Sequence, residues 1–134
     1  MSTRKSTLAT MIPLVTAALV GGVLTAGPAS AVDTGPVTYN GTVTCAKAFP
    51  APSASVPRTV TLDSDEDDAT VNVTGVDGRR ARYEIKDLEV PLDSAFNLAV
   101  TVSCKAPGKA AQNFTRTIPQ TDLVENQKVK LNIR

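Results

Sequence analysis

The sequence predicts an all-β fold, a seven-stranded antiparallel β-sandwich with one disulfide, preceded by a signal peptide. Beyond residue 31, apolar and polar residues alternate with a period of two in several short runs. Turn-forming residues, among them most of the nine prolines and eight glycines, separate these runs. The same region contains no sustained helical period. Short strands separated by turns over about 100 residues are typical of two packed sheets.

The first 31 residues are predicted to be a secretory signal peptide. Two basic residues near the N-terminus precede an uncharged apolar run, 11–27, which leads to the small residues Ala29 and Ala31. We expect cleavage after Ala31, which leaves one secreted, extracellular domain over residues 32–134. An uncleaved membrane anchor is the disfavoured alternative, because the run is shorter than the ~20 residues of a spanning helix and contains proline. The composition of this segment is typical of bacterial export signals.

The first half of the mature chain contains four predicted strands. The run 37–45 alternates cleanly, as a strand with one buried face does. The prolines of 46–57 predict an extended loop, and the acidic run 63–68 predicts a second loop. Asp77 and Gly78 are a turn signal between two alternating runs. We expect strands at 37–45, 58–62, 69–74 and 80–86, with inward residues Val37, Tyr39, Val43, Cys45, Val60, Leu62, Val71, Val73, Ala81, Tyr83 and Ile85.

The second half contains three more predicted strands. Residues 88–94 include Pro91 and are predicted to be a connection. The run 111–118 carries Arg116 on its apolar parity, which indicates either an edge strand or a bulge. We expect strands at 96–104, 111–118 and 128–134, with inward residues Phe96, Leu98, Val100, Val102, Cys104, Val129, Leu131 and Ile133.

The two cysteines, Cys45 and Cys104, each end a predicted strand on its apolar parity. In a secreted domain such a pair predicts a structural disulfide. Closing a loop of roughly 60 residues would stabilise the fold by about 4 kcal/mol on chain-entropy arithmetic. A redox-active pair is the disfavoured alternative, because the two cysteines are not closely spaced in the sequence.

The composition excludes several classes of function. The chain has no histidine, which removes Ser-His-Asp and Cys-His catalytic arrangements and histidine-ligated metals. A net charge of +1 lacks the basic excess of nucleic-acid-binding proteins. With no tryptophan and 4% aromatic residues, stacking platforms for bases or sugars are poorly supplied. We therefore expect no catalytic activity, no cofactor, no nucleic-acid partner and no membrane association of the mature form.

The order of several short motifs is informative. They are Gly41-Thr42-Val43-Thr44-Cys45, Val60-Thr61-Leu62, Asp77-Gly78-Arg79, Tyr83-Glu84-Ile85-Lys86-Asp87-Leu88, Leu98 to Gly108, and Val129 to Ile133. In this order they resemble the carboxypeptidase regulatory-like domains. The resemblance implies a transthyretin-like (prealbumin-like), Ig-like sandwich that serves structural support, adhesion or interaction and has no catalytic machinery. Domains of that family are usually attached to another domain, whereas we expect this one to stand alone.

Two activities of related sandwiches are disfavoured by the residues present. Transthyretin-like hydrolases need histidines, which this chain lacks. An intramolecular Lys–Asn isopeptide bond could use Asn132 as acceptor, but residues 37–45 contain no lysine and Lys47 lies just beyond them.

The acidic run contains a candidate cation site. Asp63, Asp65 and Asp67 have the spacing that begins an EF-hand loop, but Asp68 and Thr74 stand where that loop needs glycine and glutamate. A looser Ca²⁺ site and a solvated loop that keeps the protein soluble remain the two interpretations.

Candidate partner contacts come from two segments. Arg79, Arg80 and Arg82 form the densest basic cluster, which could meet an acidic partner or a phosphate-bearing wall polymer, or could be a solvated face. We expect a small secreted non-catalytic module, a monomer or weak oligomer, for interaction with a protein or cell-surface component. The alternative is a secreted inhibitor of an extracellular protease that acts through the proline-rich loop 48–57, with Phe49 as anchor.

Overall fold

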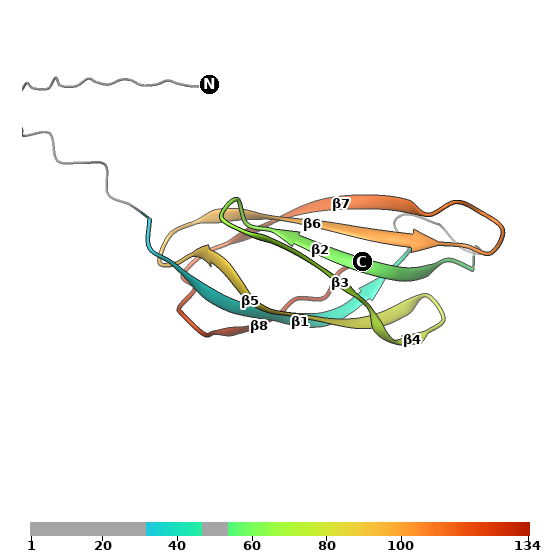
Figure 1. Ribbon diagram of the computed structural model, residues 1–134, viewed down its shortest axis with the longest axis horizontal. Coiled ribbons are helices and arrows are strands. Elements are labelled where there is room, and N and C mark those ends of the chain that lie inside the picture. The colour runs from blue at the N-terminus through green and yellow to red at the C-terminus, as the bar shows by residue number, and fades with distance from the viewer. Residues whose placement is uncertain (1–31, 47–53) are drawn as a thin grey trace, which may run out of the picture. The chain divides into compact units, whose positions relative to one another are not determined.

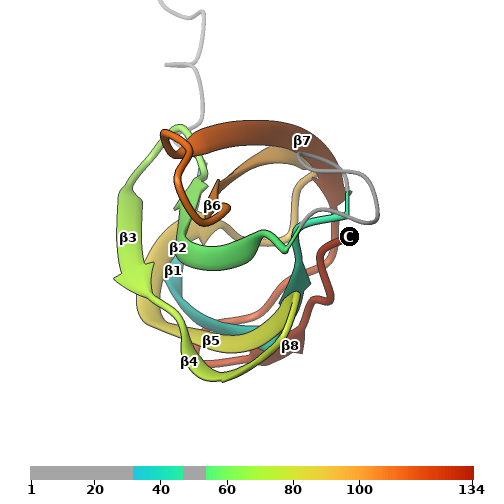
Figure 2. The same cartoon turned by 90° about the vertical axis from the view of Figure 1, so that its right-hand side faces the viewer.

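The computed structural model describes residues 32–46 and 54–134, where eight strands form two facing sheets (Figure 1). The strand orders are β4-β5-β1-β8 and β3-β2-β6-β7. The strands are β1 (Thr34–Thr44), β2 (Val56–Asp63), β3 (Asp68–Asn72), β4 (Thr74–Asp77), β5 (Arg80–Pro91), β6 (Phe96–Lys105), β7 (Gln112–Gln120) and β8 (Lys128–Lys130). The end-on view shows the two layers curving around a shared interior (Figure 2). The predicted signal peptide lies outside the described residues.

The prediction of an all-β sandwich is confirmed, although the strands number eight rather than seven. The additional strand arises because the run predicted as 69–74 is divided between the two sheets. β3 ends at Asn72, and the chain crosses at Val73 to form β4 at the edge of the other sheet. The Val73 N–H donates to the carbonyl of Arg58 at 3.0 Å, which holds the crossing point against β2. No helix in the described ranges has the length and apolarity needed to cross a membrane.

The prediction of a connection at 88–94 is wrong for its first four residues, because β5 continues to Pro91. Asp87 has a positive φ of 55°, and the pairing of β5 with β1 shifts register beside it. This irregularity reverses the side-chain parity, so Leu88 and Val90 face the core although they lie out of phase with Ile85. Pro91 is tolerated because it is the last residue of the strand.

The C-terminal segment also differs from the prediction of a strand at 128–134. β8 covers only Lys128–Lys130, and it pairs with β1 in parallel, whereas every other strand pair is antiparallel. The chain then leaves regular pairing and rejoins β1 through a single bridge between Ile133 and Val43. Gly41 lies opposite this irregular stretch, and the carbonyl of Leu131 approaches it too closely for a side chain at position 41.

β7 confirms one of the two interpretations of Arg116. It is the edge strand of its sheet and pairs with β6 alone, without a register shift. An exposed Arg116 on the inward parity is therefore explained by the edge position and not by a bulge.

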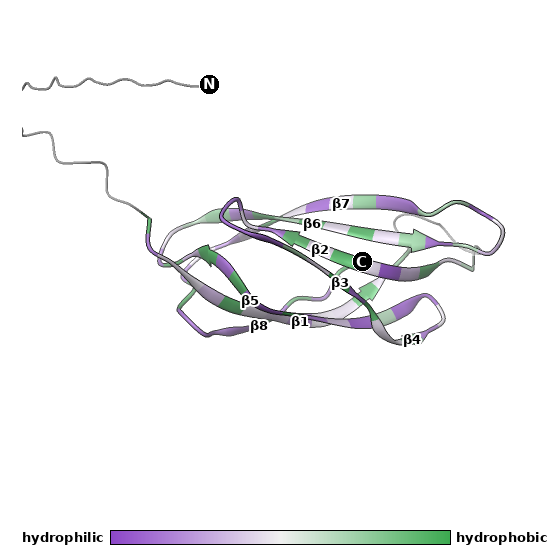
Figure 3. Cartoon of the chain, in the orientation of Figure 1, coloured by the Kyte–Doolittle hydropathy of each residue, from purple (hydrophilic) through white to green (hydrophobic). Residues whose placement is uncertain are grey.

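The interior contains the residues that the alternation placed inward and, in addition, Leu88, Val90, Ala106 and Leu123. Figure 3 shows how hydrophobic and hydrophilic residues alternate along the strands. Most are fully buried, while Val71, Val73, Phe96, Val129 and Leu131 are partly buried at its margin. The predicted disulfide is present: Cys45 and Cys104 are both buried, and their Cα atoms are 6.0 Å apart. The bond joins the end of β1 to the end of β6, so it connects the two sheets.

Candidate anion-binding face

The structure separates the three predicted contact arginines. Arg80 and Arg82 are exposed on the outer face of β5, opposite Thr44 and Thr42 of β1. Arg79 is half-buried in the preceding turn, and its guanidinium donates to the carbonyl of Cys45 at 3.3 Å. Arg79 therefore helps to fix the turn beside the disulfide, while the exposed Arg80 and Arg82 are available to a partner.

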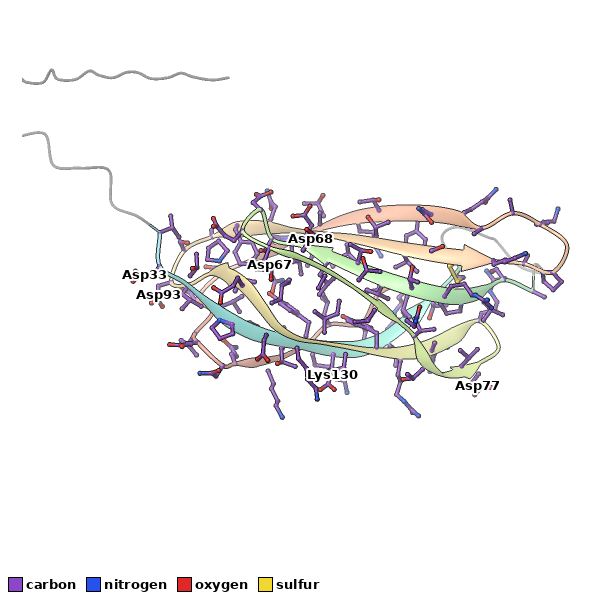
Figure 4. All side chains as sticks on the ribbon, viewed as in Figure 1. Asp33, Asp67, Asp68, Asp77, Asp93 and Lys130 are labelled. Atoms are coloured by element: carbon purple, nitrogen blue, oxygen red, sulfur yellow. A yellow bond between two sulfur atoms is a disulfide. The ribbon has the colours of Figure 1, made fainter. Side chains whose placement is uncertain are left out.

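Sequence reasoning missed the cations that β8 adds to the same surface. Because β8 pairs with β1 in parallel, the outward residues Lys128 and Lys130 lie beside Thr38 and Asn40. Figure 4 shows Lys130 directed away from the opposite sheet. We call the outer surface of β5, β1 and β8 the basic face, defined by Arg80, Arg82, Lys86, Lys128, Lys130 and Arg134.

Few acidic groups offset these charges. In the described part of the chain, a single ion pair occurs, between Lys86 and Glu84 of the same strand at 3.8 Å. Both side chains are largely exposed, so this pair contributes little to stability. Asp77 of β4 lies opposite Arg80 in the register. Other carboxylates gather at the far end of the sandwich, where Figure 4 places Asp33, Asp67, Asp68 and Asp93.

One corner of the basic face is hollowed into an open concavity of about 410 Å³. Its lining residues are Thr42, Thr44, Ala46, Arg80, Lys130, Asn132 and Arg134. Three of these side chains are cationic and none is acidic. Nearby, the guanidinium of Arg116 donates to the main-chain oxygen of Arg134.

Asn132 has a fixed orientation in this concavity. Its Oδ1 accepts hydrogen bonds from the backbone N–H of Thr42 at 3.0 Å and from the hydroxyl of Thr42 at 3.2 Å. A backbone N–H can only donate, so the oxygen of the amide must face Thr42. Among the described residues, the Nδ2 group of Asn132 then has no acceptor, and its two N–H donors remain available.

A larger concavity, of about 490 Å³, lies at the ends of β6 and β7. Its lining residues are Ala95, Phe96, Asn97, Pro119, Gln120 and Thr121. It contains no charged side chain and offers only amides and a hydroxyl to orient a ligand. The smaller concavity therefore offers charged groups that can select a ligand, which the larger one lacks.

The acidic run forms a tight loop whose carboxylates point to backbone groups. Asp63 Oδ1 accepts the N–H of Asp65 at 3.0 Å, and Asp67 Oδ2 accepts the N–H of Glu89 at 3.3 Å. Buried Ser64, which sequence reasoning missed, donates from Oγ to the carbonyl of Glu89 at 2.5 Å. Within the described ranges, no group of three or more acidic or cysteine side chains could hold a metal ion. Two of the three predicted cation ligands, Asp63 and Asp67, thus accept hydrogen bonds within the fold, and the cation site itself stays a prediction.

The predicted inhibitory loop is described only from residue 54 onward, so Phe49 lies outside the described residues, as does Lys47. The described part of this loop leads into β2, which begins at Val56 and not at the predicted residue 58. Ser55 just before it is fully buried. The role of Phe49 as an anchor stays a prediction.

Comparison of the chain with protein-family models, curated proteins and solved structures gives no match. The resemblance to carboxypeptidase regulatory-like domains therefore stays a prediction. The fold described above rests on the strands and their pairing.

Proposed function

We propose that this chain is a small extracellular, non-catalytic binding module that docks onto an anionic protein or cell-surface component through its basic face. The observation that carries the proposal is a collection of six cations, five on β5 and β8 and Arg134 just beyond β8, against the nearby acids Asp77, Glu84 and Asp87. A surface with one dominant sign of charge steers an oppositely charged partner and raises its association rate.

Two further features support this role. Five of the six cations project from β5 and β8, which hold them at fixed spacings and lower the entropy lost when a partner binds. The buried Cys45–Cys104 disulfide is compatible with an extracellular location, where such bonds persist. A module for adhesion or interaction is also what the family resemblance implies.

Charge reversal tests the proposal. The double variant Arg80→Glu/Lys130→Glu should bind the producing culture's isolated cell envelope at least tenfold more weakly than the unmodified protein, in a sedimentation assay at low salt. The matched control is Arg58→Glu/Lys105→Glu, which changes the net charge equally at exposed positions on the other sheet. Equal binding by both variants, or an equal loss in both, would show that the basic face is not the docking surface.

A further inference from the structure

We infer that the concavity lined by Arg80, Lys130, Asn132 and Arg134 is an oxyanion site that holds phosphate groups of an extracellular polymer. The inference rests on the proposed function, because it names the ligand of the same basic face. It begins from the side chains that line the concavity, three of which are cationic and can only donate hydrogen bonds.

Each polar group of the lining favours an anion with several oxygens. The guanidinium groups of Arg80 and Arg134 and the ammonium of Lys130 can only donate. The hydroxyl of Thr44 can donate, and Thr42 fixes Asn132 so that its amide N–H groups remain free. An oxyanion can accept from all of these donors and also complements the three positive charges, whereas a cation would be repelled and a neutral ligand would leave the charges uncompensated.

The number and placement of the donors favour phosphate over carboxylate. The donors come from four strands or segments, namely β1, β5, β8 and the C-terminal segment, and together surround the concavity. A carboxylate presents two oxygens in one plane, while the oxygens of a phosphate group are arranged tetrahedrally around phosphorus. Arginine forks also pair with two phosphate oxygens at once.

The surroundings of the concavity favour a polymer over a free ion. The site is open, and cations recur along both flanking strands, at Arg80 and Arg82 on β5 and at Lys128 and Lys130 on β8. Residues two positions apart on a strand lie roughly 7 Å from each other on one face. A chain with repeating phosphates could therefore place one group in the concavity and further groups along the two rows.

The variant Asn132→Asp isolates this site. The carboxylate keeps an oxygen for the N–H and hydroxyl of Thr42, so the local fold should be retained. It replaces the two amide donors with a negative oxygen that repels a phosphate. We expect this variant to bind a poly(glycerol phosphate) oligomer at least tenfold more weakly by isothermal titration calorimetry, with an unchanged melting temperature. Asn97→Asp, on the outer face of the other sheet, adds the same charge and should bind normally.

Three comparisons decide the ligand. A polyglutamate of equal charge should bind the unmodified protein at least tenfold more weakly than the phosphate polymer, and inorganic phosphate should compete only at far higher concentration. Equal binding of the two polymers would overturn the assignment to phosphate. Binding to phosphatidylglycerol vesicles but not to the phosphate polymer would overturn the assignment to a polymer.

The outcomes also separate this inference from the proposed function. If Asn132→Asp binds the polymer normally while Arg80→Glu/Lys130→Glu does not, the basic face binds anions but the oxyanion site is wrong. If both variants bind normally, the proposed function fails as well.

Discussion

Replacement of Gly41 by alanine should detach the C-terminal segment from the centre of the first sheet. A Cβ at this position would lie 2.2 Å from the carbonyl oxygen of Leu131 and 2.9 Å from Oδ1 of Asn132. The carbonyl is backbone and cannot rotate away, so the segment itself must shift. Gly41→Ala should therefore disrupt the local hydrogen bonds between this segment and β1.

The expected loss of unfolding free energy follows from the hydrogen bonds that the Gly41→Ala substitution would break. The N–H of Leu131 donates to the carbonyl of Asn40 at 2.8 Å, and the N–H of Ile133 donates to the carbonyl of Thr42 at 2.8 Å. Oδ1 of Asn132 accepts from the backbone N–H of Thr42 at 3.0 Å. At a net 0.5–1.5 kcal/mol for each bond, their loss lowers the free energy of unfolding by about 2 to 4 kcal/mol. Binding at the concavity should fall as well, because Asn132 would lose its fixed orientation.

Urea unfolding of the oxidised protein measures this loss, with Gly35→Ala as the control on the same strand. A Cβ on Gly35 would lie 2.8 Å from Cδ1 of Leu92 and 3.2 Å from Cγ of Glu125. Both atoms belong to flexible side chains that can move, so we expect a loss below about 1 kcal/mol. An unfolding free energy for Gly41→Ala that equals that of the unmodified protein would refute the close approach of the C-terminal segment.

Three other predictions concern stability. Replacing Cys45 and Cys104 by serine should lower the unfolding free energy by about 4 kcal/mol in urea, and a loss below about 1 kcal/mol would contradict the entropic argument. Ser64→Ala should cost about 1–3 kcal/mol and speed amide exchange in the loop 63–68, because its backbone partners lose a buried hydroxyl; unchanged exchange would contradict that role. Burial raises the pKa of Tyr39 from 10.0 to about 12, and the pKa of Tyr83 is also raised, by burial and then by Tyr39. Since the folded state holds the Tyr39 proton more tightly, the contribution of Tyr39 to stability is complete below pH 10 and is lost as the pH rises through 12. Ultraviolet absorbance should show little phenolate near pH 10.5 while the protein is folded, because the chain has only these two tyrosines; a full titration there would contradict their burial.

Most of the core could be predicted from the sequence, because every second residue of a half-buried strand faces inward and is apolar. Tyr83 and Ile85 illustrate this, and both are buried as the alternation indicated. Alternation does not predict residues 88–91 as strand, because the register irregularity at Asp87 reverses the parity within β5. Alternation also fails at Val73, because periodicity says nothing about which sheet a strand joins.

The candidate site was only partly predictable, for a different reason. Arg80 was visible as part of a basic cluster, but Lys130 and Asn132 lie 50 or more positions further along the chain. They reach the same corner only through the parallel pairing of β8 with β1. Nothing in the local sequence signals a parallel pair of three residues, so the concavity emerges from the topology alone.

That topology also determines when the protein can fold. β1 is the first strand to leave the ribosome, yet its neighbours are β5 and β8, and Thr42 meets Asn132 across 90 positions. An unfinished chain would expose the edges of β1 without a partner, and contacts between distant segments form slowly. The first sheet is thus completed only after residues 128–134 have been synthesised. Residues 128–134 act as the closing piece, and a truncation there should leave β1 unpaired along one edge.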